Sequence, residues 1–231
     1  MSIRLITFDL DNTLWDVTPV MQSAEASLRA WLGEHAPLLG AVPIEHLWAI
    51  RARLLSDEPA LKYRLSELRR RILLLALQEA GYPAQQAGPL AEAGFQTFMS
   101  ARHQVTLFAD VHATLAQLAK QYQLAVITNG NADVRRLGLA EYFTFTLCAE
   151  ELGIGKPDPL PFQRALANAQ VRAEQAVHIG DHHEDDIAGA HAAGLRSVWF
   201  NPAAKDWLGG ERAHGEIRHL SQLPALLADW H

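Results

Sequence analysis

The sequence predicts an α/β fold in which a parallel-sheet domain is interrupted by an inserted all-α helical bundle. A short apolar run between Ile3 and Phe8 is typical of a buried central strand. From about residue 110 onward, apolar strand-like segments alternate with helix-like segments, which predicts right-handed crossovers and a parallel sheet. Between these two regions, residues 19–103 show helical periodicity and no convincing strand.

The composition is that of an ordinary globular protein. Its 231 residues suffice for one large domain or two small ones, and 49% are hydrophobic and 20% charged. A formal net charge of -6 and a pI near 6.0 argue against sequence-independent binding to nucleic acid. The local basic run at Arg69–Arg71 is interpreted as a solvated helix face.

The cysteine count and the hydropathy indicate the compartment. Cys148 is the only cysteine, so an intrachain disulfide is impossible and a reducing compartment fits. Asp9 and Asp11 interrupt the N-terminal apolar stretch, which does not match a signal peptide. No window approaches the roughly 20 apolar residues of a membrane span. We therefore expect a soluble cytoplasmic protein with no membrane or nucleic-acid partner.

The inserted block is expected to fold as four helices joined by short loops, which is the pattern of a small bundle. Gly81 and Pro37 supply helix-ending signals within it. The apolar periodicities place the helices at about residues 20–32, 43–55, 61–75 and 83–102. The expected domain division is therefore 1–15 plus 104–231 for the α/β core, and 16–103 for the helical insertion.

The α/β pattern after the insertion is read from apolar, β-branched segments that end in small or turn-forming residues. The expected strands are residues 124–128, 143–148, 176–179 and 197–200, with an edge strand near Ile217. The first expected helix begins at Val111, and the others cover residues 132–139, 161–169, 187–193 and 221–230.

Four polar segments lie at or near the ends of these expected strands. In parallel sheets, side chains at the carboxyl ends of strands converge on one crevice, where ligands bind. Asp9 and Asp11 would repel each other there unless a proton or a hard cation such as Mg²⁺ lay between them. The other segments are Thr128-Asn129-Gly130, Lys156 beside a proline, and the acidic loop Gly180–Asp186.

Each segment taken alone has a simpler explanation. Asp9 and Asp11 could be solvated turn acids, since Asp is a common turn former. Thr128 could be an ordinary β-branched strand residue, Lys156 a surface lysine, and the acidic loop a solvated helix start. Their joint occurrence, in this order and at these strand ends, favours a single catalytic centre.

With these segments in this order, the chain resembles the haloacid dehalogenase-like hydrolase superfamily. The first motif is Asp9-Leu-Asp-Asn-Thr-Leu14, the second Thr128, the third Lys156, and the fourth Gly180-Asp181 with Asp186 five positions on. The resemblance covers essentially the whole chain and includes the helical insertion, which is the type-1 cap of that family. It implies a Rossmann-like parallel-sheet core with a helical cap.

The resemblance also implies roles for the motif residues. Asp9 would be the nucleophile that forms an aspartyl-phosphate, and Asp11 the general acid and then base. Thr128, with groups at Asn129 and Gly130, would bind the phosphoryl group, and Lys156 would neutralise charge between Asp9 and phosphate. The residues expected to hold Mg²⁺ are Asp9, Asp181 and the backbone carbonyl of Asp11, with Asp186 acting through water or Lys156.

Asp11 also separates branches of the family. In its dehalogenases the corresponding position is not an acid, so Asp11 favours phosphoryl transfer over carbon–halogen cleavage. It also argues against a phosphonatase, which carries a small residue there. A sugar-phosphate phosphatase or phosphomutase on the same core remains an alternative. So does a non-catalytic binding protein, although none of the motif residues is lost.

Within the phosphatases, three segments resemble one bacterial branch. That branch dephosphorylates flavin mononucleotide and 5-amino-6-(5-phospho-D-ribitylamino)uracil. The matching segments are Trp15-Asp16, Ile127-Thr-Asn-Gly-Asn131 and Leu137–Phe143. We therefore expect a small phosphate ester as substrate, and a monomer or homodimer. His182 and His183 depart from the branch pattern, and are expected either to contact substrate or metal or to be plain loop residues.

The cap is expected to select the substrate, because the motif residues recognise only phosphate and metal. Trp15 at the hinge would either stack on a planar ring or plug the space between core and cap. Gly130 is a further substrate-binding candidate. Arg69 and Arg71 would either reach the leaving group or lie on the surface. The cap is expected to open and close on the core to admit substrate and exclude water.

Overall fold

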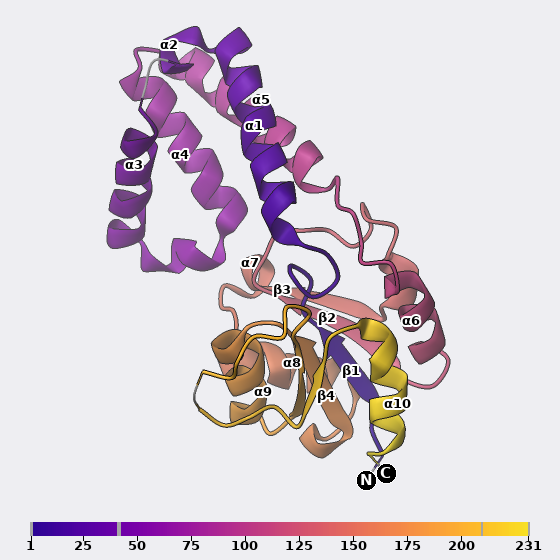
Figure 1. The fold of residues 1–231 in the computed structure, drawn as a ribbon. Coiled ribbons are helices and arrows are strands. Elements are labelled where there is room, and N and C mark those ends of the chain that lie inside the picture. The colour runs from indigo at the N-terminus through magenta and orange to yellow at the C-terminus, as the bar shows by residue number, and fades with distance from the viewer. Residues whose placement is uncertain (1, 41–42, 209, 231) are drawn as a thin grey trace. The chain divides into compact units, whose positions relative to one another are not determined.

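The computed structural model describes residues 2–40, 43–208 and 210–230 (Figure 1). The chain divides into two compact units. The first combines the residues up to Asp16 with those from Thr106 onward, and the second comprises Val17–Val105. Each unit has its own buried core, and that the second acts as a cap stays a prediction.

The first unit is built on a six-stranded sheet whose neighbouring strands all pair in parallel. The order is β3-β2-β1-β4-β5-β6, which is the expected Rossmann-like architecture. The strands are β1 (Leu5–Phe8), β2 (Gln123–Thr128), β3 (Phe145–Cys148), β4 (Ala176–Gly180), β5 (Arg196–Phe200) and β6 (Gly215–Ile217).

Strand β1 occupies the centre of this sheet, as its apolar sequence predicts. All four of its residues are buried, as expected for a strand covered on both faces. Phe8 lies opposite Val126 of β2 and Ile179 of β4. Because the chain order reverses at β1, a crevice opens at its carboxyl end. The residue that follows Phe8 therefore enters this crevice.

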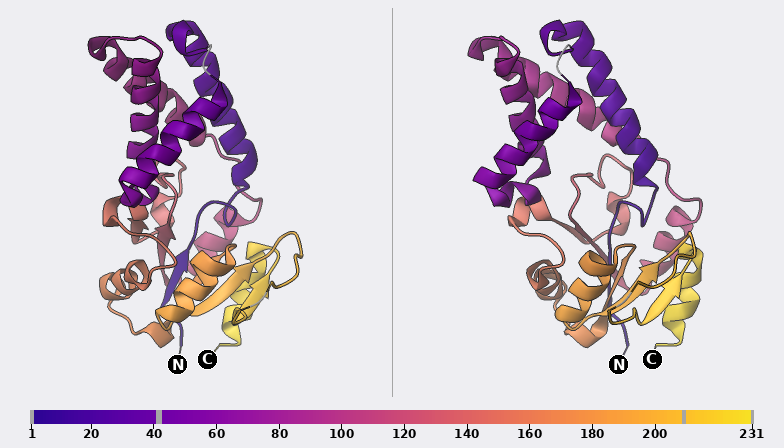
Figure 2. Two further views of the ribbon diagram at one scale, coloured as in Figure 1. Left: turned by 90° about the vertical axis from the view of Figure 1, so that its left-hand side faces the viewer. Right: turned by 60° about the vertical axis from the view of Figure 1, so that its left-hand side comes forward.

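Helices cover both sides of the sheet (Figures 1 and 2). The apolar side chains of α8 and α9, including Phe162 and Ala190, join Leu5 and Ala125 in one buried cluster. Helices α6 and α10 lie side by side across the sheet from them. The helices of this unit are α6 (Val111–Leu118), α7 (Ala149–Leu152), α8 (Pro159–Ala169), α9 (Gly189–Ala192) and α10 (Leu223–Ala228).

In its described residues, 17–40 and 43–105, the second unit is all-helical, with bounds a few residues from those expected. Its core includes Leu28, Leu77 and Phe98, and α1 packs closely on α5, where Gly94 leaves room for Leu28. A short 3-10 helix, Pro59–Tyr63, precedes α4. The helices are α1 (Val17–His35), α2 (Pro37–Gly40), α3 (Ile44–Asp57), α4 (Leu65–Glu79) and α5 (Ala84–Arg102).

Two helices expected from the sequence differ in the structure. The helix expected over residues 132–139 is wrong: residues 134–138 form turns, and a short 3-10 helix follows at Ala140–Tyr142. Gly138 adopts a positive φ of 68°, a conformation that interrupts a right-handed helix. The helix expected over 187–193 begins earlier, as a π-helical turn at His183–Ala188 that leads into α9.

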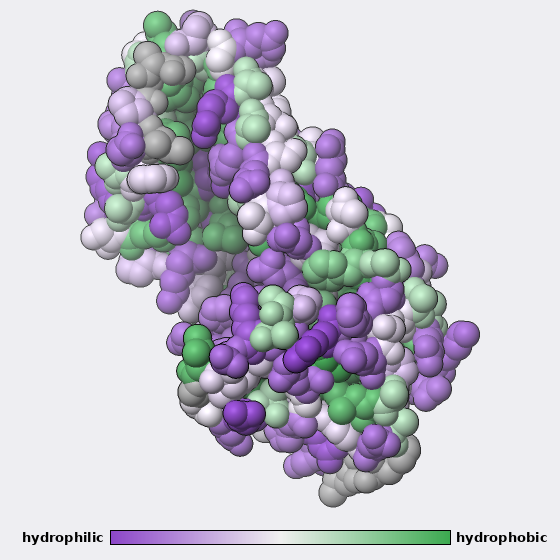
Figure 3. Space-filling model, viewed as in Figure 1, coloured by the Kyte–Doolittle hydropathy of each residue, from purple (hydrophilic) through white to green (hydrophobic). Residues whose placement is uncertain are grey.

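Figure 3 shows hydrophilic side chains over most of the visible face of each unit, with apolar residues between them. Within the part of the chain that the structure describes, the exposed large apolar side chains lie apart in the sequence and are Leu38, Trp48, Leu160 and Leu208. Among the described residues, none of the helices combines the length and the apolar character needed to cross a membrane.

Candidate active site

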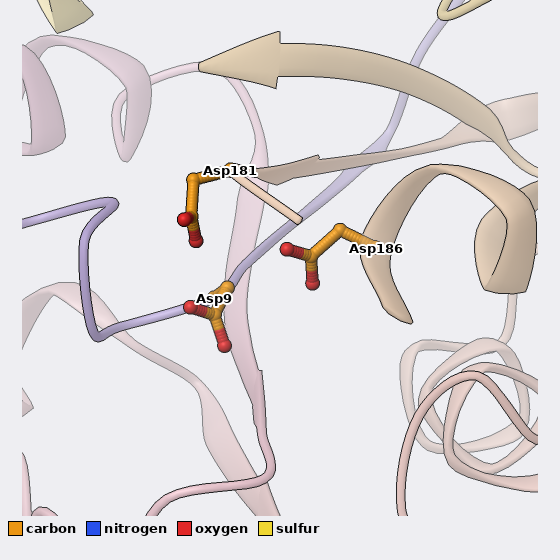
Figure 4. A group of neighbouring side chains, drawn as sticks. All are labelled: Asp9, Asp181 and Asp186. Carbon is orange, nitrogen blue, oxygen red and sulfur yellow. The ribbon is translucent and has the colours of Figure 1, made fainter. Parts of the chain in front are cut away.

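The carboxyl edge of the sheet gathers a group of acidic side chains. Asp9 directly follows β1, Asp181 follows β4, and Asp186 lies in the π-helical turn. Figure 4 shows the three carboxyl groups converging, and one oxygen of each lies within 4.8 Å of the others. The sequence-predicted acids of the first and fourth motifs therefore meet at one point.

Lys156 lies between two of these acids and is itself buried. Its Nζ donates to Asp9 Oδ1 at 2.7 Å and to Asp186 Oδ1 at 2.6 Å. Burial alone would lower the pKa of Lys156, but the charges of Asp186 and Asp9 raise it above its ordinary value. Lys156 is therefore a permanent cation, held beside Asp9 from a loop far along the chain.

Together, the carboxylates of Asp9, Asp181 and Asp186 carry more negative charge than the Lys156 ammonium can balance. Burial, opposed by Lys156, raises the pKa of Asp9 well above its ordinary value. Burial and the nearby Asp186 charge raise the pKa of Asp181 to about 6. Three carboxylates against one ammonium leave the group negative, so a second positive charge would stabilise it.

Asp186 differs from the other two acids because its oxygens are already used. Oδ1 accepts hydrogen bonds from Lys156 and from His178 Nε2 at 3.0 Å, and Oδ2 accepts from the His182 backbone N–H at 2.9 Å. Lys156 and His178 hold the pKa of Asp186 below its ordinary value despite its burial. Three of the roughly four accepting positions of this carboxylate are therefore used inside the protein, which suits a supporting role better than direct ligation of a metal.

The donor set fits a hard divalent cation. Carboxylate oxygens are the ligands that Mg²⁺ prefers, and the two acids with raised pKa values are those with oxygen atoms to spare. Asp11 follows Asp9 at the same edge, and the Trp15 indole N–H donates to Asp11 Oδ1 at 3.0 Å. The residues that could hold the cation are therefore Asp9 and Asp181, with Asp11 adjacent.

The second motif lies at the end of β2, where Thr128 is buried and its Oγ1 accepts from the Gly130 N–H at 3.0 Å. The Asn129 side chain is used inside the protein. Its Oδ1 accepts from the Lys156 backbone N–H and its Nδ2 donates to the Lys156 carbonyl, both at 2.8 Å. Asn129 Nδ2 also lies 3.2 Å from Asp185 Oδ2. Its side chain therefore clasps the loop that carries Lys156.

The side chains of two substrate-binding candidates outside the motifs, Trp15 and Arg69, make contacts within the protein. Trp15 is fully buried and pairs through its backbone with Leu107. Arg69 belongs to the second unit, where its guanidinium lies 3.6 Å from the Phe98 ring centre and 2.8 Å from Glu25. Each of these side chains has a structural role, and substrate binding by them stays a prediction.

The two histidines that depart from the motif pattern have structural partners as well. His182 Nδ1 accepts from the Asp185 backbone N–H at 3.1 Å, at the start of the π-helical turn. The His183 ring packs against Trp199 and Trp207, with ring centres 4.6 and 4.2 Å apart. Trp199 also donates its indole N–H to the Asp181 carbonyl at 3.0 Å. These contacts fit the plainer of the two expectations for the histidines.

His178 is the site residue that the sequence analysis did not single out. It is fully buried in β4, next to Asp186. A signal for it exists in the sequence, because it is the polar residue in the otherwise apolar strand Ala176–Ile179. A polar side chain there must find a buried partner, since burying it unpaired is costly.

Fold and site together define a class of protein: a hydrolase with a parallel-sheet core and an acidic, cation-binding centre at the carboxyl edge. The family model of haloacid dehalogenase-like hydrolases matches residues 3–194. The chain therefore belongs to the haloacid dehalogenase-like hydrolases, and it is an enzyme of their phosphatase class.

Individual relatives match over nearly the whole chain. The 5-amino-6-(5-phospho-D-ribitylamino)uracil phosphatase of Escherichia coli is 32% identical, covering 97% of this chain and 96% of its own. A crystal structure from Pseudomonas syringae, described as a 2-haloacid dehalogenase, is 58% identical with a TM-score of 0.98, covering 99% of this chain and 100% of its own. A HAD-hydrolase of Bacillus subtilis, bound to magnesium, is 26% identical with a TM-score of 0.65, covering 98% and 99%.

Proposed function

We propose that the protein is a Mg²⁺-dependent phosphomonoesterase that hydrolyses a small phosphorylated metabolite through an aspartyl-phosphate on Asp9. The observation that carries this proposal is the buried Asp9 carboxylate, paired with Lys156 at 2.7 Å and placed beside Asp181. A carboxylate nucleophile needs nearby positive charge to accept a phosphoryl group, because phosphoryl transfer depends on positioning and charge stabilisation.

In the first half of the proposed reaction, Asp9 attacks phosphorus in line with the ester oxygen. Lys156 bonds Oδ1, so Oδ2 is the atom we assign to the attack. The phosphorus–oxygen bond of the ester breaks, and the leaving alkoxide takes a proton from Asp11. In the second half, Asp11 takes a proton from water, whose oxygen attacks phosphorus. Inorganic phosphate leaves and the Asp9 carboxylate is restored.

The phosphoryl oxygens need donors, and the second motif offers them. We assign phosphate binding to the Thr128 hydroxyl, to Lys156 and to the backbone around Asn129 and Gly130. Because the Asn129 side chain is bonded to Lys156, we assign its part in phosphate binding to its backbone rather than its amide. Asp9, Asp181 and the Asp11 carbonyl would hold Mg²⁺, with Asp186 supporting them. When bound, the cation would offset the charge of the carboxylates and of the phosphoryl oxygens.

For the substrate we propose flavin mononucleotide or 5-amino-6-(5-phospho-D-ribitylamino)uracil. The named activity of the Escherichia coli relative supports the second of these. We assign substrate choice to the helical unit, acting as a cap. The candidate substrate contacts are Arg69 of this unit, and Trp15 and Gly130 of the first unit. A cytoplasmic location fits the single cysteine, and the oligomeric state that we propose is a monomer or homodimer.

Carbon–halogen cleavage is the second candidate, and the description of the Pseudomonas syringae relative favours it. Asp11 argues against it here, because an acid two residues after the nucleophile suits protonation of an ester oxygen and a halide leaves without a proton. The acidic group at Asp9 and Asp181 also suits a cation that dehalogenation does not need. A phosphomutase or a phosphatase of sugar phosphates would use the same residues, so only a substrate panel separates them.

The test is release of phosphate from a panel of phosphate esters with Mg²⁺, run beside release of halide from 2-chloropropionate. The panel contains flavin mononucleotide, the ribitylaminouracil phosphate, sugar phosphates and nucleotides, with Asp9→Asn and Asp11→Asn as variants. We expect one of the first two esters to give the highest kcat/KM and Asp9→Asn to be inactive. If sugar phosphates give the highest kcat/KM, the proposed substrate is wrong. If halide is released and phosphate is not, the proposed reaction class is wrong.

A further inference from the structure

Behind the proposed catalytic site, a chain of hydrogen bonds runs through the buried interior of the sheet. Thr7 Oγ1 lies 2.8 Å from His178 Nδ1, and His178 Nε2 lies 3.0 Å from Asp186 Oδ1. The same Asp186 oxygen accepts from Lys156 Nζ, which also donates to Asp9. Thr7 and His178 are fully buried, and neither touches the place where substrate would react.

The partners of His178 determine which nitrogen carries its proton. Asp186 Oδ1 is a carboxylate oxygen that only accepts, so the facing Nε2 must be the donor. In the neutral ring Nδ1 then has a lone pair that accepts from the Thr7 hydroxyl at 2.8 Å, since the other acceptor near this hydroxyl, the Val177 carbonyl, is more distant at 3.4 Å. Burial lowers the pKa of His178, which fits a neutral ring. The His178 and Phe162 rings pack almost perpendicular to each other, with their centres 5.1 Å apart, which restricts the plane of the imidazole.

We propose that His178 is a positioning residue that, as the neutral Nε2–H tautomer oriented by Thr7, sets how the Lys156 ammonium is shared between Asp186 and Asp9. This inference rests on the proposed function, because it assigns His178 a part in the reaction at Asp9. It adds Thr7 and His178 to the residues that the motifs identify.

The shared oxygen explains why this position matters. Asp186 Oδ1 divides its accepting capacity between His178 and Lys156. Without the His178 donor, Asp186 would bind Lys156 more strongly and draw the ammonium away from Asp9. Asp186 would also lose one of the contacts that fix its orientation, since Lys156 has a flexible stem. Both effects would weaken charge neutralisation at the proposed nucleophile and leave the substrate-binding surface unchanged.

The first measurement uses the wild-type protein. Long-range ¹H–¹⁵N correlation of the imidazole rings, with His178→Gln used to assign the signal, reports which nitrogen of His178 is protonated. We expect the neutral Nε2–H form at pH 7. A ring protonated only at Nδ1 would overturn the inference, because no N–H would then face Asp186. A ring protonated at both nitrogens would also overturn it, because Nδ1 could not accept from Thr7.

The second measurement compares variants in the phosphate-release assay. His178→Leu removes the donor, whereas His178→Gln keeps an N–H near the position of Nε2, and His178→Asn places its amide near Nδ1, out of reach of Asp186. We expect His178→Leu and His178→Asn to lower kcat about 10- to 100-fold, as outer-shell substitutions in metal sites do. KM should change less than about threefold, and His178→Gln should recover most of kcat.

Val177→Ala is the matched control, since Val177 is fully buried in the same strand. It should lower the thermal midpoint without lowering kcat. If His178→Leu does not fold, the comparison of His178→Asn with His178→Gln decides. If the wild type is active and all the His178 variants keep its kcat, the role proposed for His178 is overturned and the proposed function stands. A wild type that releases no phosphate from any ester would overturn the proposed function instead.

Discussion

At the scale of single residues, Lys156 is the centre of the charge arrangement. It is almost fully buried between Asp9 and Asp186, so the carboxylate oxygens that face it are bonded to the ammonium and not to water. A buried ion pair adds little net stability, but removing one member leaves an uncompensated charge and is costly. The same ammonium thus supports both the fold and the proposed chemistry.

Replacing this ammonium is expected to cost both stability and activity. Lys156→Met should lower the free energy of unfolding by about 3–5 kcal/mol at pH 7, because Asp186 and Asp9 lose their buried counter-ion. Phosphate release should fall below detection. Urea denaturation and the ester assay measure the two effects. A variant as stable as the wild type would show that the two acids are neutralised in another way.

Asp181 links the pH to the effect of the metal. Its pKa is raised from an ordinary 3.8 to about 6, so the folded protein binds this proton more tightly than the unfolded chain does. The contribution of this group to stability is therefore present below about pH 4 and is lost as the pH rises toward 6. Above pH 6 a bound cation would compensate the ionised carboxylate, whereas below it the proton competes with the cation.

We therefore expect Mg²⁺ to raise Tm more at pH 8 than at pH 5. Thermal melts with and without Mg²⁺ at the two pH values measure this difference, and chelation by EDTA should reverse the shift at pH 8. In Asp181→Asn the Mg²⁺-induced rise in Tm at pH 8 should be much smaller, because one of the carboxylates assigned to the cation is removed. Equal Mg²⁺ shifts at both pH values in the wild type would contradict this assignment of the metal ligand.

At the scale of elements, the π-helical turn after β4 shapes the acidic loop. His182 accepts from the backbone N–H groups of both Asp186 and Ile187, and the second of these bonds is the wider π-type closure. The turn folds Asp186 back over Gly180, where a Cβ would overlap the carboxyl group. π-Turns are rare and are often found at functional sites.

Gly180→Ala is expected to displace Asp186. The added methyl group has no free space, so we expect a loss of about 1–3 kcal/mol in unfolding free energy, typical of overpacking, and a fall in kcat. Gly33→Ala is the control, because Gly33 lies in helix α1 with open space around the position of an added methyl group, and this variant should be stabilised by roughly 0.4–1 kcal/mol. Chemical denaturation and phosphate release on both variants test the claim; unchanged kcat in Gly180→Ala would refute it.

The loop that carries Lys156 is held by the Asn129 side chain, and a second asparagine makes the same kind of clasp elsewhere. Asn201 Oδ1 accepts from the Lys205 backbone N–H and its Nδ2 donates to the Lys205 carbonyl, both at 2.9 Å. The two sites provide a matched pair with similar local geometry, of which only Asn129 holds a residue assigned to the reaction.

Both Asn129→Ala and Asn201→Ala are expected to lower the unfolding free energy by about 1–3 kcal/mol, the cost of leaving buried polar groups unpaired. Only Asn129→Ala should also lower kcat, because it releases Lys156. Denaturation curves and steady-state kinetics of both variants provide the comparison. Equal kcat values in the two variants would show that the clasp at Asn129 serves stability alone.

At the scale of the whole molecule, the chain passes twice between its two compact units, after Asp16 and after Val105. The proposed cap function requires the helical unit to change its position when substrate binds. We expect the radius of gyration to fall when beryllofluoride and Mg²⁺, which imitate a bound phosphoryl group, are added. Small-angle X-ray scattering measures it, with Asp9→Asn as the control that should not respond. Identical scattering with and without the ligand would remove closure from the mechanism.

Most of the fold and most of the site could be predicted from the sequence, for a physical reason. Apolar runs in the sequence predict buried strands such as β1, and the topology of a parallel sheet brings the carboxyl ends of its strands together. Asp9, Lys156 and Asp181 could therefore be grouped before the structure was known. The helix expected over residues 132–139 failed because a local pattern does not report the backbone conformation at Gly138.

The supporting contacts could not be predicted in the same way. The bond between Thr7 and His178 joins residues 171 positions apart, and the clasp of Asn129 on Lys156 spans 27 positions. Such contacts depend on register and on side-chain direction, which sequence periodicity does not specify. The π-helical turn could not be predicted either, because its residues are also compatible with an ordinary loop.

The central place of β1 has a consequence for how the protein is made. Leu5–Phe8 is synthesised well before both of its partners in the sheet, which are β2, beginning at Gln123, and β4, beginning at Ala176. At about 5–20 residues per second, the nascent strand waits roughly ten to thirty seconds for β4. The helical unit, Val17–Val105, is complete long before and contains its own core. During synthesis a completed bundle is therefore joined to an unpaired apolar strand, and an unpaired apolar strand is the kind of segment that makes a partly folded chain prone to aggregation.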